Sequence, residues 1–214
     1  MVLLTNKIEE RYNIIKNGIF FESDSREEAY KIQLFFEESV VKRYGKDEQV
    51  IIRTVVDNFA QPRRKYEVNM SKIIRENVVN EWTDFINSLG QVIGKMDPLV
   101  KSEAQSKPVY KTVSETNTAA PDHSIVTIDP DRAYRSQIFL EQFIEGYRIS
   151  SVKKSRIFVE TEIAIDPDAS ASMWVYTVSI KCKFPNTKDE ELHEFFEAAK
   201  ASCHQLQRKV DSQA

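Results

Sequence analysis

Two nine-residue segments, 104 positions apart, resemble each other closely and constrain the fold more than any other feature of this chain. Residues 29–37 read AYKIQLFFE and residues 133–141 read AYRSQIFLE, with five identities and three conservative exchanges. The same offset aligns Ser25 with Asp129, and both residue types favour the N-cap position of a helix. Self-similarity at one offset indicates a structural unit that occurs twice. The alternative is a pair of unrelated amphipathic helices of similar composition.

The apolar pattern and the turn residues around each segment predict the same order of elements: helix, strand, strand and helix. In the first unit these are expected at residues 25–45, 49–56, 65–70 and 71–93, with Pro62 in the turn between the strands. In the second unit they are expected at residues 129–146, 155–165, 174–184 and 187–210, with a turn at 166–168 and a capping box of Thr187 and Glu190. A further helix, capped by Thr5 and ended by Gly18, is expected before the first unit.

Each predicted hairpin needs a partner, because a lone two-stranded hairpin is only marginally stable in water. The simplest arrangement sets the two hairpins edge to edge or face to face about an approximate twofold axis, with the long amphipathic helices packed on them. We therefore expect an α+β fold made by internal duplication, with helix–hairpin–helix units at residues 1–96 and 125–214. Such a fold leaves outer strand edges available to other molecules.

Residues 97–124 differ from the rest of the chain, with three prolines, many Ser, Thr and Lys residues and few large apolar side chains. Long segments without structure are uncommon inside compact domains, so this stretch is predicted to be a polar linker or arm. Within it, Val109, Tyr110 and Val113 belong to a short extended segment suited to pairing with a neighbour's strand edge. Docking on its own domain and disorder are the alternatives.

The motif content argues against the common enzyme classes. The five glycines form neither GxGxxG nor GxxxxGK[ST], so the sequence has no loop of the kind that cradles nucleotide phosphates. It also has no HExxH, CxxC or GxSxG motif. Glu160 and Glu162 share one face of a predicted strand, where acid–base chemistry is conceivable, but a solvated sheet face is the simpler interpretation. We expect no enzymatic activity, no cofactor, no metal and no small-molecule substrate.

The charge balance bears on nucleic-acid binding. Thirty Lys and Arg residues against 33 Asp and Glu residues give a net charge of -3, which argues against a surface devoted to nucleic acid. Two basic clusters beside the predicted hairpins are nevertheless candidate contacts for a phosphate backbone or a partner: Arg63, Arg64, Lys65, Lys153, Lys154 and Arg156. The alternative is that these cations guard strand ends against edge pairing.

The cysteine content and the apolar runs bear on location. Cys182 and Cys203 make no disulfide framework, so two reduced thiols in a cytoplasmic protein are expected. No run approaches the roughly 18 apolar residues that would span a membrane. The apolar stretch at residues 1–5 is too short for a secretory signal. We therefore expect no contact with a membrane.

Adjacent phenylalanines occur at positions 20–21, 35–36 and 195–196. Neighbouring residues on a helix cannot both face a narrow core, so some of these rings are candidates for covering a partner; a wide buried face within the monomer is the alternative. We therefore hypothesise a non-enzymatic structural or assembly protein that contacts protein subunits in a homo-oligomer or in a larger particle such as a virion. A nucleic-acid-binding module that uses the basic clusters is the first alternative, and a hydrolase that uses Glu160 and Glu162 is the second.

Overall fold

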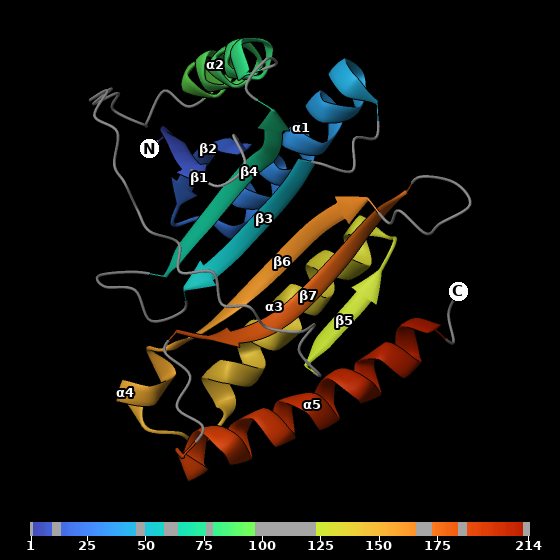
Figure 1. The fold of residues 1–214 in the computed structure, drawn as a ribbon. Coiled ribbons are helices and arrows are strands. Elements are labelled where there is room, and N and C mark those ends of the chain that lie inside the picture. Colours follow the sequence, from blue (N-terminus) through green and yellow to red (C-terminus); the bar gives the residue numbers. More distant parts are fainter. Residues whose placement is uncertain are drawn as a thin grey trace.

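The computed structural model describes residues 2–9, 14–45, 50–57, 64–75, 79–96, 123–165, 173–183 and 188–211. Its elements in chain order are β1 (Val2–Glu9), β2 (Ile14–Ser23), α1 (Arg26–Tyr44), β3 (Val50–Asp57), β4 (Lys65–Arg75), α2 (Val79–Met96), β5 (Ser124–Thr127), α3 (Pro130–Gly146), α4 (Ser151–Lys154), β6 (Ile157–Ile165), β7 (Trp174–Cys182) and α5 (Glu190–Asp211) (Figure 1). The predicted α+β class is confirmed.

All seven strands belong to one sheet, in the order β1-β2-β4-β3-β6-β7-β5, and every neighbouring pair is antiparallel. The two predicted hairpins, β3 with β4 and β6 with β7, are both present. They lie edge to edge, because β3 pairs directly with β6. The predicted units therefore share one continuous sheet.

The strand order reads the same from either side of the β3–β6 junction. On one side the order is β3, β4, β2, and on the other it is β6, β7, β5. In each half, α1 or α3 connects two strands that are separated in the sheet by the second strand of the hairpin. At the junction itself, Thr54 of β3 lies opposite Thr161 of β6.

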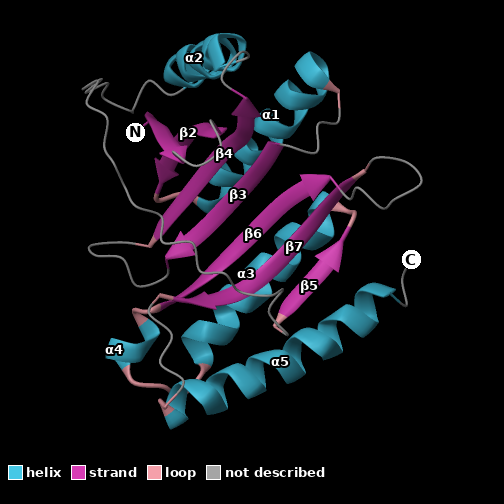
Figure 2. Ribbon diagram, in the orientation of Figure 1, coloured by secondary structure: helices cyan, strands magenta, loops and turns pink. Residues whose placement is uncertain are grey.

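One face of the sheet is covered by helices, and we call it the covered face. Helix α1 contacts β2, β3 and β4, while α3 contacts β5, β6 and β7. Both helices lie behind the strands in Figure 2. In β3 the buried residues alternate with half-buried ones, so Val50, Ile52, Thr54 and Val56 face the helices. The half-buried residues between these four lie on the opposite face of the sheet, which we call the open face.

The two central helices begin and end as their sequences predict. The Ser25 hydroxyl accepts a hydrogen bond from the backbone N–H of Glu28 and caps α1. The Asp129 carboxylate caps α3 by accepting hydrogen bonds from the backbone N–H groups of Asp131 and Arg132. Pro130 takes the first helical position. Gly45 ends α1 with a φ of 71°, a left-handed value that costs glycine little.

The predicted capping box at the start of the last helix is wrong. Helix α5 begins at Glu190, and the Asp189 carboxylate accepts from the backbone N–H of Leu192 at 3.3 Å. Asp189 is therefore the N-cap, and Thr187 lies outside the described residues. The apolar stripe of this helix is confirmed, since Leu192, Phe195 and Cys203 are buried in the core.

The predicted N-terminal helix is also wrong, because strands β1 and β2 occupy residues 2–9 and 14–23. Gly18 shows the reason: a Cβ there would lie 2.4 Å from the backbone oxygen of Met70, so the glycine permits close approach of β2 to β4. It does not end a helix. The helix expected over residues 71–93 also begins late, because residues 71–75 continue β4 in its pairing with β2 and α2 spans Val79–Met96.

Two further expectations concern the segments between the units and the phenylalanine pairs. Most of the predicted linker, including the candidate arm Val109, Tyr110 and Val113, lies outside the described residues, as do the two hairpin turns. The end of that stretch, Ser124, begins strand β5, which the sequence did not reveal. One member of each phenylalanine pair is buried, and Phe35 and Phe196 pack half-buried against the core, in agreement with the monomer alternative.

Candidate functional site

A buried chain of polar side chains runs from α1 to the sheet in the first half. Gln33 and Glu37 are one helical turn apart, and the Gln33 amide donates to Glu37 Oε1 at 3.2 Å. Thr54, on the covered face of β3, donates its hydroxyl to Gln33 Oε1 at 2.7 Å. Tyr176, from β7 of the other half, donates its hydroxyl to Glu37 Oε2 at 2.5 Å. These contacts satisfy polar groups that would otherwise be costly to bury.

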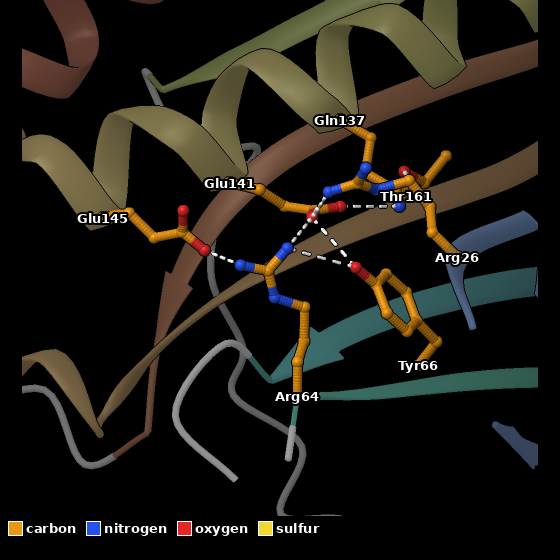
Figure 3. Close-up of polar contacts among 7 residues, drawn as sticks. All are labelled: Arg26, Arg64, Tyr66, Gln137, Glu141, Glu145 and Thr161. Atoms are coloured by element: carbon orange, nitrogen blue, oxygen red, sulfur yellow. Dashed lines mark hydrogen bonds and ion pairs between the residues drawn. The ribbon is translucent and has the colours of Figure 1, made fainter. Parts of the chain in front are cut away.

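The second half contains the same chain, drawn in Figure 3. Thr161 donates to Gln137 Oε1 at 3.0 Å, and the Gln137 amide donates to Glu141 Oε1 at 3.1 Å. Tyr66, from β4 of the first half, donates to Glu141 Oε2 at 3.2 Å. Each buried glutamate is therefore bound by a tyrosine from the opposite half, so the two chains link the halves to each other.

Glu141 differs from Glu37 because two guanidinium groups surround it. Arg26 Nη2 lies 2.7 Å and Arg64 Nη1 lies 3.0 Å from Glu141 Oε2 (Figure 3). Arg64 also pairs with Glu145, one turn further along α3. The side chain of Glu141 is fully buried, whereas those of Arg26 and Arg64 are 24% and 28% exposed. The buried negative charge is thus compensated by cations that reach water.

No such cation binds Glu37 among the residues that the structure describes. Among these residues, Tyr176 and Gln33 donate hydrogen bonds to Glu37, and the position that matches Arg26 at the 104-residue offset is Pro130. Burial raises the pKa of Glu37, and the hydrogen bonds from the two partners offset only part of this effect. Burial, followed by the hydrogen bond to Glu37, also raises the pKa of Tyr176. The pKa of the Glu37 carboxyl group is therefore higher than that of an exposed glutamate.

The two halves also meet through aromatic rings. Tyr30 of α1 and Tyr134 of α3 stack with ring centroids 4.2 Å apart and planes 16° apart. The Tyr30 hydroxyl donates to the Asp131 carboxylate at 3.1 Å. Tyr30 and Tyr134 occupy the same place in the two similar nine-residue segments. Equivalent residues therefore face each other at the helix contact, as Thr54 and Thr161 do in the sheet.

The described members of the first basic cluster are held by carboxylates. Arg64 binds Glu141 and Glu145, and Lys65 binds Glu22 at 2.7 Å. Arg63 lies outside the described residues. These ion pairs reduce the positive charge that the cluster presents to a phosphate backbone.

The second basic cluster is similarly engaged. Lys153 binds Asp189 at 2.6 Å and Glu191 at 2.7 Å, and Arg156 lies 4.0 Å from Asp189. Lys154 donates to the backbone oxygen of Glu145 at 2.8 Å. Since Arg64 pairs with the side chain of the same Glu145, the structure brings the two clusters together at the end of α3.

The candidate carboxylates Glu160 and Glu162 share the open face of β6, as predicted. Glu160 pairs with Lys181 of β7, and Glu162 pairs with Arg53 of β3 at 2.7 Å. On the same face, Lys183 reaches Asp57 at 2.6 Å. Opposite charges therefore pair across the strands of this face, which stabilises the sheet, and Glu160 is only 8% exposed.

Thiol and metal chemistry find little support in the described part of the chain. Cys182 and Cys203 are free thiols, and burial raises the pKa of Cys203 to about 11. The described residues contain no group of three or more His, Cys, Asp or Glu side chains that could hold a metal ion. Within the same residues, no helix has the length and apolar character needed to cross a membrane.

The outer edge of β5 is bound by a side chain. Strand β5 pairs with β7 on one side. On the other side, the Val126 N–H donates to Gln207 Oε1 at 2.8 Å, and Gln207 Nε2 donates back to the Val126 oxygen at 3.0 Å. Val126 is 44% exposed and Ile128 is 62% exposed. This edge therefore combines apolar exposure with a Val126 backbone that is bound by an amide side chain of α5.

No protein-family model, no curated protein and no solved structure matches this chain. The sequence did carry a signal for part of the buried polar chains. Gln33 and Glu37 are identical to Gln137 and Glu141 in the two similar segments, and they are polar residues within an apolar stripe. It carried no signal for Tyr66, Tyr176 or Gln207, whose contacts depend on pairing between distant segments.

Proposed function

We propose that this chain is a non-enzymatic assembly protein that contacts other protein subunits, including copies of itself, through the outer edge of its sheet. Its partners form a homo-oligomer or a larger particle. We also propose that its two halves arose by internal duplication, so that the chain imitates a homodimer. The two free thiols are typical of a protein in a reducing, intracellular environment.

The doubled polar chains support the duplication. Thr54, Gln33 and Glu37 in one half have the same hydrogen bonds as Thr161, Gln137 and Glu141 in the other. The strand order is also the same on both sides of the β3–β6 junction. Two unrelated helices of similar composition would not be expected to share both a hydrogen-bonding chain and a strand order.

The composition of the β5 edge is the observation that carries the assembly proposal. Natural edge strands are usually protected by charged residues, prolines or bulges that prevent pairing with another chain. Residues 124–128 read Ser-Ile-Val-Thr-Ile, without a charge or a proline. Val126 and Ile128 expose apolar surface there, and such surface on a strand edge favours association with another protein.

The ion pairs support the absence of catalysis. Glu160 and Glu162, the carboxylates best placed for acid–base chemistry, are bound to Lys181 and Arg53. A general acid or base must be free to reach a substrate proton. Burial raises the pKa values of Glu37 and Tyr176, and both groups lie in the interior between the halves.

The test is the mass of the purified protein in solution, measured by light scattering over a range of concentrations. We expect the mass to rise with concentration in the wild type. The variant Ile128→Asp is expected to remain at the mass of one chain, because the new charge cannot be buried in an apolar contact. Val152→Asp is the matched control, since Val152 is 75% exposed on α4, away from β5. A monomer at all concentrations, or equal effects of both variants, would contradict the proposal.

Nucleic-acid binding is the second candidate, and the meeting of the two basic clusters at Glu145 favours it. The same experiment with an added oligonucleotide separates the two functions. Phosphate binding weakens steeply as salt is raised, whereas apolar contacts respond little. A monomer that binds the oligonucleotide at low salt and releases it at moderate salt would favour the second candidate over the first.

A further inference from the structure

Helices α2 and α5 occupy matching places in the two halves. Helix α2 contacts β2, and α5 contacts β5, the strand that matches β2 in the sheet order. Buried residues recur in the two helices with an offset of 110 positions: Trp82 and Leu192, Leu89 and Ala199, Ile93 and Cys203. At this offset Met96, the last residue of α2, matches Leu206, and α5 continues from Gln207 to Asp211. The residues of the first half that would match Gln207 lie outside the described part of the chain.

The outer edges of the matching strands β2 and β5 are covered in two different ways. In the first half, β1 pairs with β2 along its whole length, although α2 also contacts β2. A helix in this position is thus compatible with an added strand. In the second half, α5 lies alongside β5 (Figure 1). The Gln207 amide is hydrogen-bonded to the backbone of Val126 at the outer edge of β5.

The Gln207 side chain copies what a neighbouring strand would offer. In an antiparallel sheet, a hydrogen-bonded residue pair exchanges two bonds, N–H to oxygen in each direction. The Gln207 amide does the same with one residue, since it accepts from the Val126 N–H and donates to the Val126 oxygen. Val126 is therefore a position whose backbone is ready to pair with a strand, and Gln207 is a replaceable substitute for that strand.

We propose that the last turn of α5 is a displaceable guard on β5, and that the strand it excludes is β5 of a second copy. The two strands run antiparallel with Val126 opposite its own counterpart. This inference rests on the proposed assembly function and adds the partner, the register and the regulation of the same edge.

The chemistry of the edge favours a second copy. Residues 124–128 carry no charge, so two copies meet without like-charge repulsion. With Val126 facing Val126, both backbone groups of each copy are satisfied reciprocally, as a twofold contact requires. The side chains of Val126 and Ile128, two positions apart, lie on the same side of the strand, where the second copy covers them. The β3–β6 junction joins the halves by the same kind of pairing, with Thr54 opposite Thr161.

The test compares Gln207→Ala with Gln205→Ala. Gln205 is an exposed neighbour on the same helix and serves as the matched control. The alanine at position 207 removes two hydrogen bonds that compete with strand pairing, so we expect the monomer–dimer dissociation constant to fall about tenfold relative to wild type and Gln205→Ala. Circular dichroism establishes that both variants remain folded. The double variant Gln207→Ala with Ile128→Asp is expected to return to the monomer.

The outcomes separate the guard from the assembly function. If the wild type self-associates and Ile128→Asp prevents it, but Gln207→Ala behaves as Gln205→Ala, the assembly proposal stands and the guard is refuted. If Gln207→Ala dimerises and Ile128→Asp leaves that dimer intact, the contact is elsewhere and both fail. If the mass of Gln207→Ala grows beyond two chains, the contact is open-ended and the twofold β5 pairing is refuted.

Discussion

Glu37 and Glu141 hold matching places in the two halves, yet replacing each by glutamine should have unequal effects. The Glu141 carboxylate is fully buried and binds Arg26 and Arg64. Removing one partner of a buried ion pair costs about 3–5 kcal/mol. The two guanidinium groups reach water, and Arg64 keeps its ion pair with Glu145. We therefore expect Glu141→Gln to lower the free energy of unfolding by about 3 kcal/mol, near the lower end of this range. This loss lowers the melting temperature of a chain of this size by roughly 6–12 °C.

Glu37→Gln should cost less than about 1 kcal/mol near neutral pH, because the amide leaves no cation unpaired and the Tyr176 hydroxyl can rotate to serve it. The pH dependence follows from the raised pKa of Glu37 in the folded state. A raised folded pKa gives stability that is fully present below the unfolded pKa and is lost as the pH rises through the folded pKa. Glu37→Gln removes this loss, so its stability relative to wild type should improve from about pH 4 upward.

The assay is urea unfolding of the wild type, both glutamine variants and Glu38→Gln, each at about pH 5 and about pH 8. Glu38 is exposed beside Glu37, so its replacement should stay within about 0.5 kcal/mol of wild type. Equal losses for Glu37→Gln and Glu141→Gln would refute the argument that the arginines decide the difference. A Glu37→Gln variant with the same pH dependence as wild type would refute the inference that burial raises the pKa of Glu37.

Three further outcomes can be measured, the first two at single positions and the third on a fragment of the chain. Gly18→Ala should destabilise the protein by about 1–3 kcal/mol, because its Cβ would meet the backbone oxygen of Met70, whereas Gly94→Ala, with open space on α2, should stabilise it by about 0.5–1 kcal/mol in the same urea titration. At neutral pH a thiol reagent should label the half-buried Cys182 before Cys203, because burial and a raised pKa suppress the reactive thiolate of Cys203. Mass spectrometry of the labelled native protein measures the order, and earlier labelling of Cys203 would contradict this expectation. A fragment of residues 123–214 should form a homodimer through β6 with Thr161 opposite Thr161, and a monomeric, folded fragment by light scattering would count against the duplication.

Local signals predicted the elements that depend on local chemistry. The caps Ser25 and Asp129 located the starts of α1 and α3. A run of β-branched residues located β3, and the alternation of apolar and polar residues located β6. The errors lie where pairing between distant segments overrides local preference. Residues 14–23 were predicted to be partly helical, yet Gly18 is needed for the approach of β2 to β4, a contact that no local pattern shows.

The candidate site was predictable only in part for the same reason. The repeated Gln and Glu of the two helices could be found by comparing the segments, since each places a polar pair one turn apart in a buried stripe. Their tyrosine partners could not, because Tyr66 and Tyr176 reach the opposite half only through the β3–β6 pairing. Gln207 lies 81 residues from Val126, and no local pattern predicts the contact between them.

The two halves are alike where they touch each other and unlike at the outer edges of the sheet. Thr54 faces Thr161 and Tyr30 stacks on Tyr134, but β1 covers one outer strand while Gln207 covers the other. A chain with two equivalent sticky edges would pair head to tail without end. Because the edges differ, the proposed pairing of β5 with β5 would close at two chains and leave the β1 edges outside. Exchanging the guard for a strand at β5 would therefore control whether the protein is a monomer or a dimer, without opening a route to filaments.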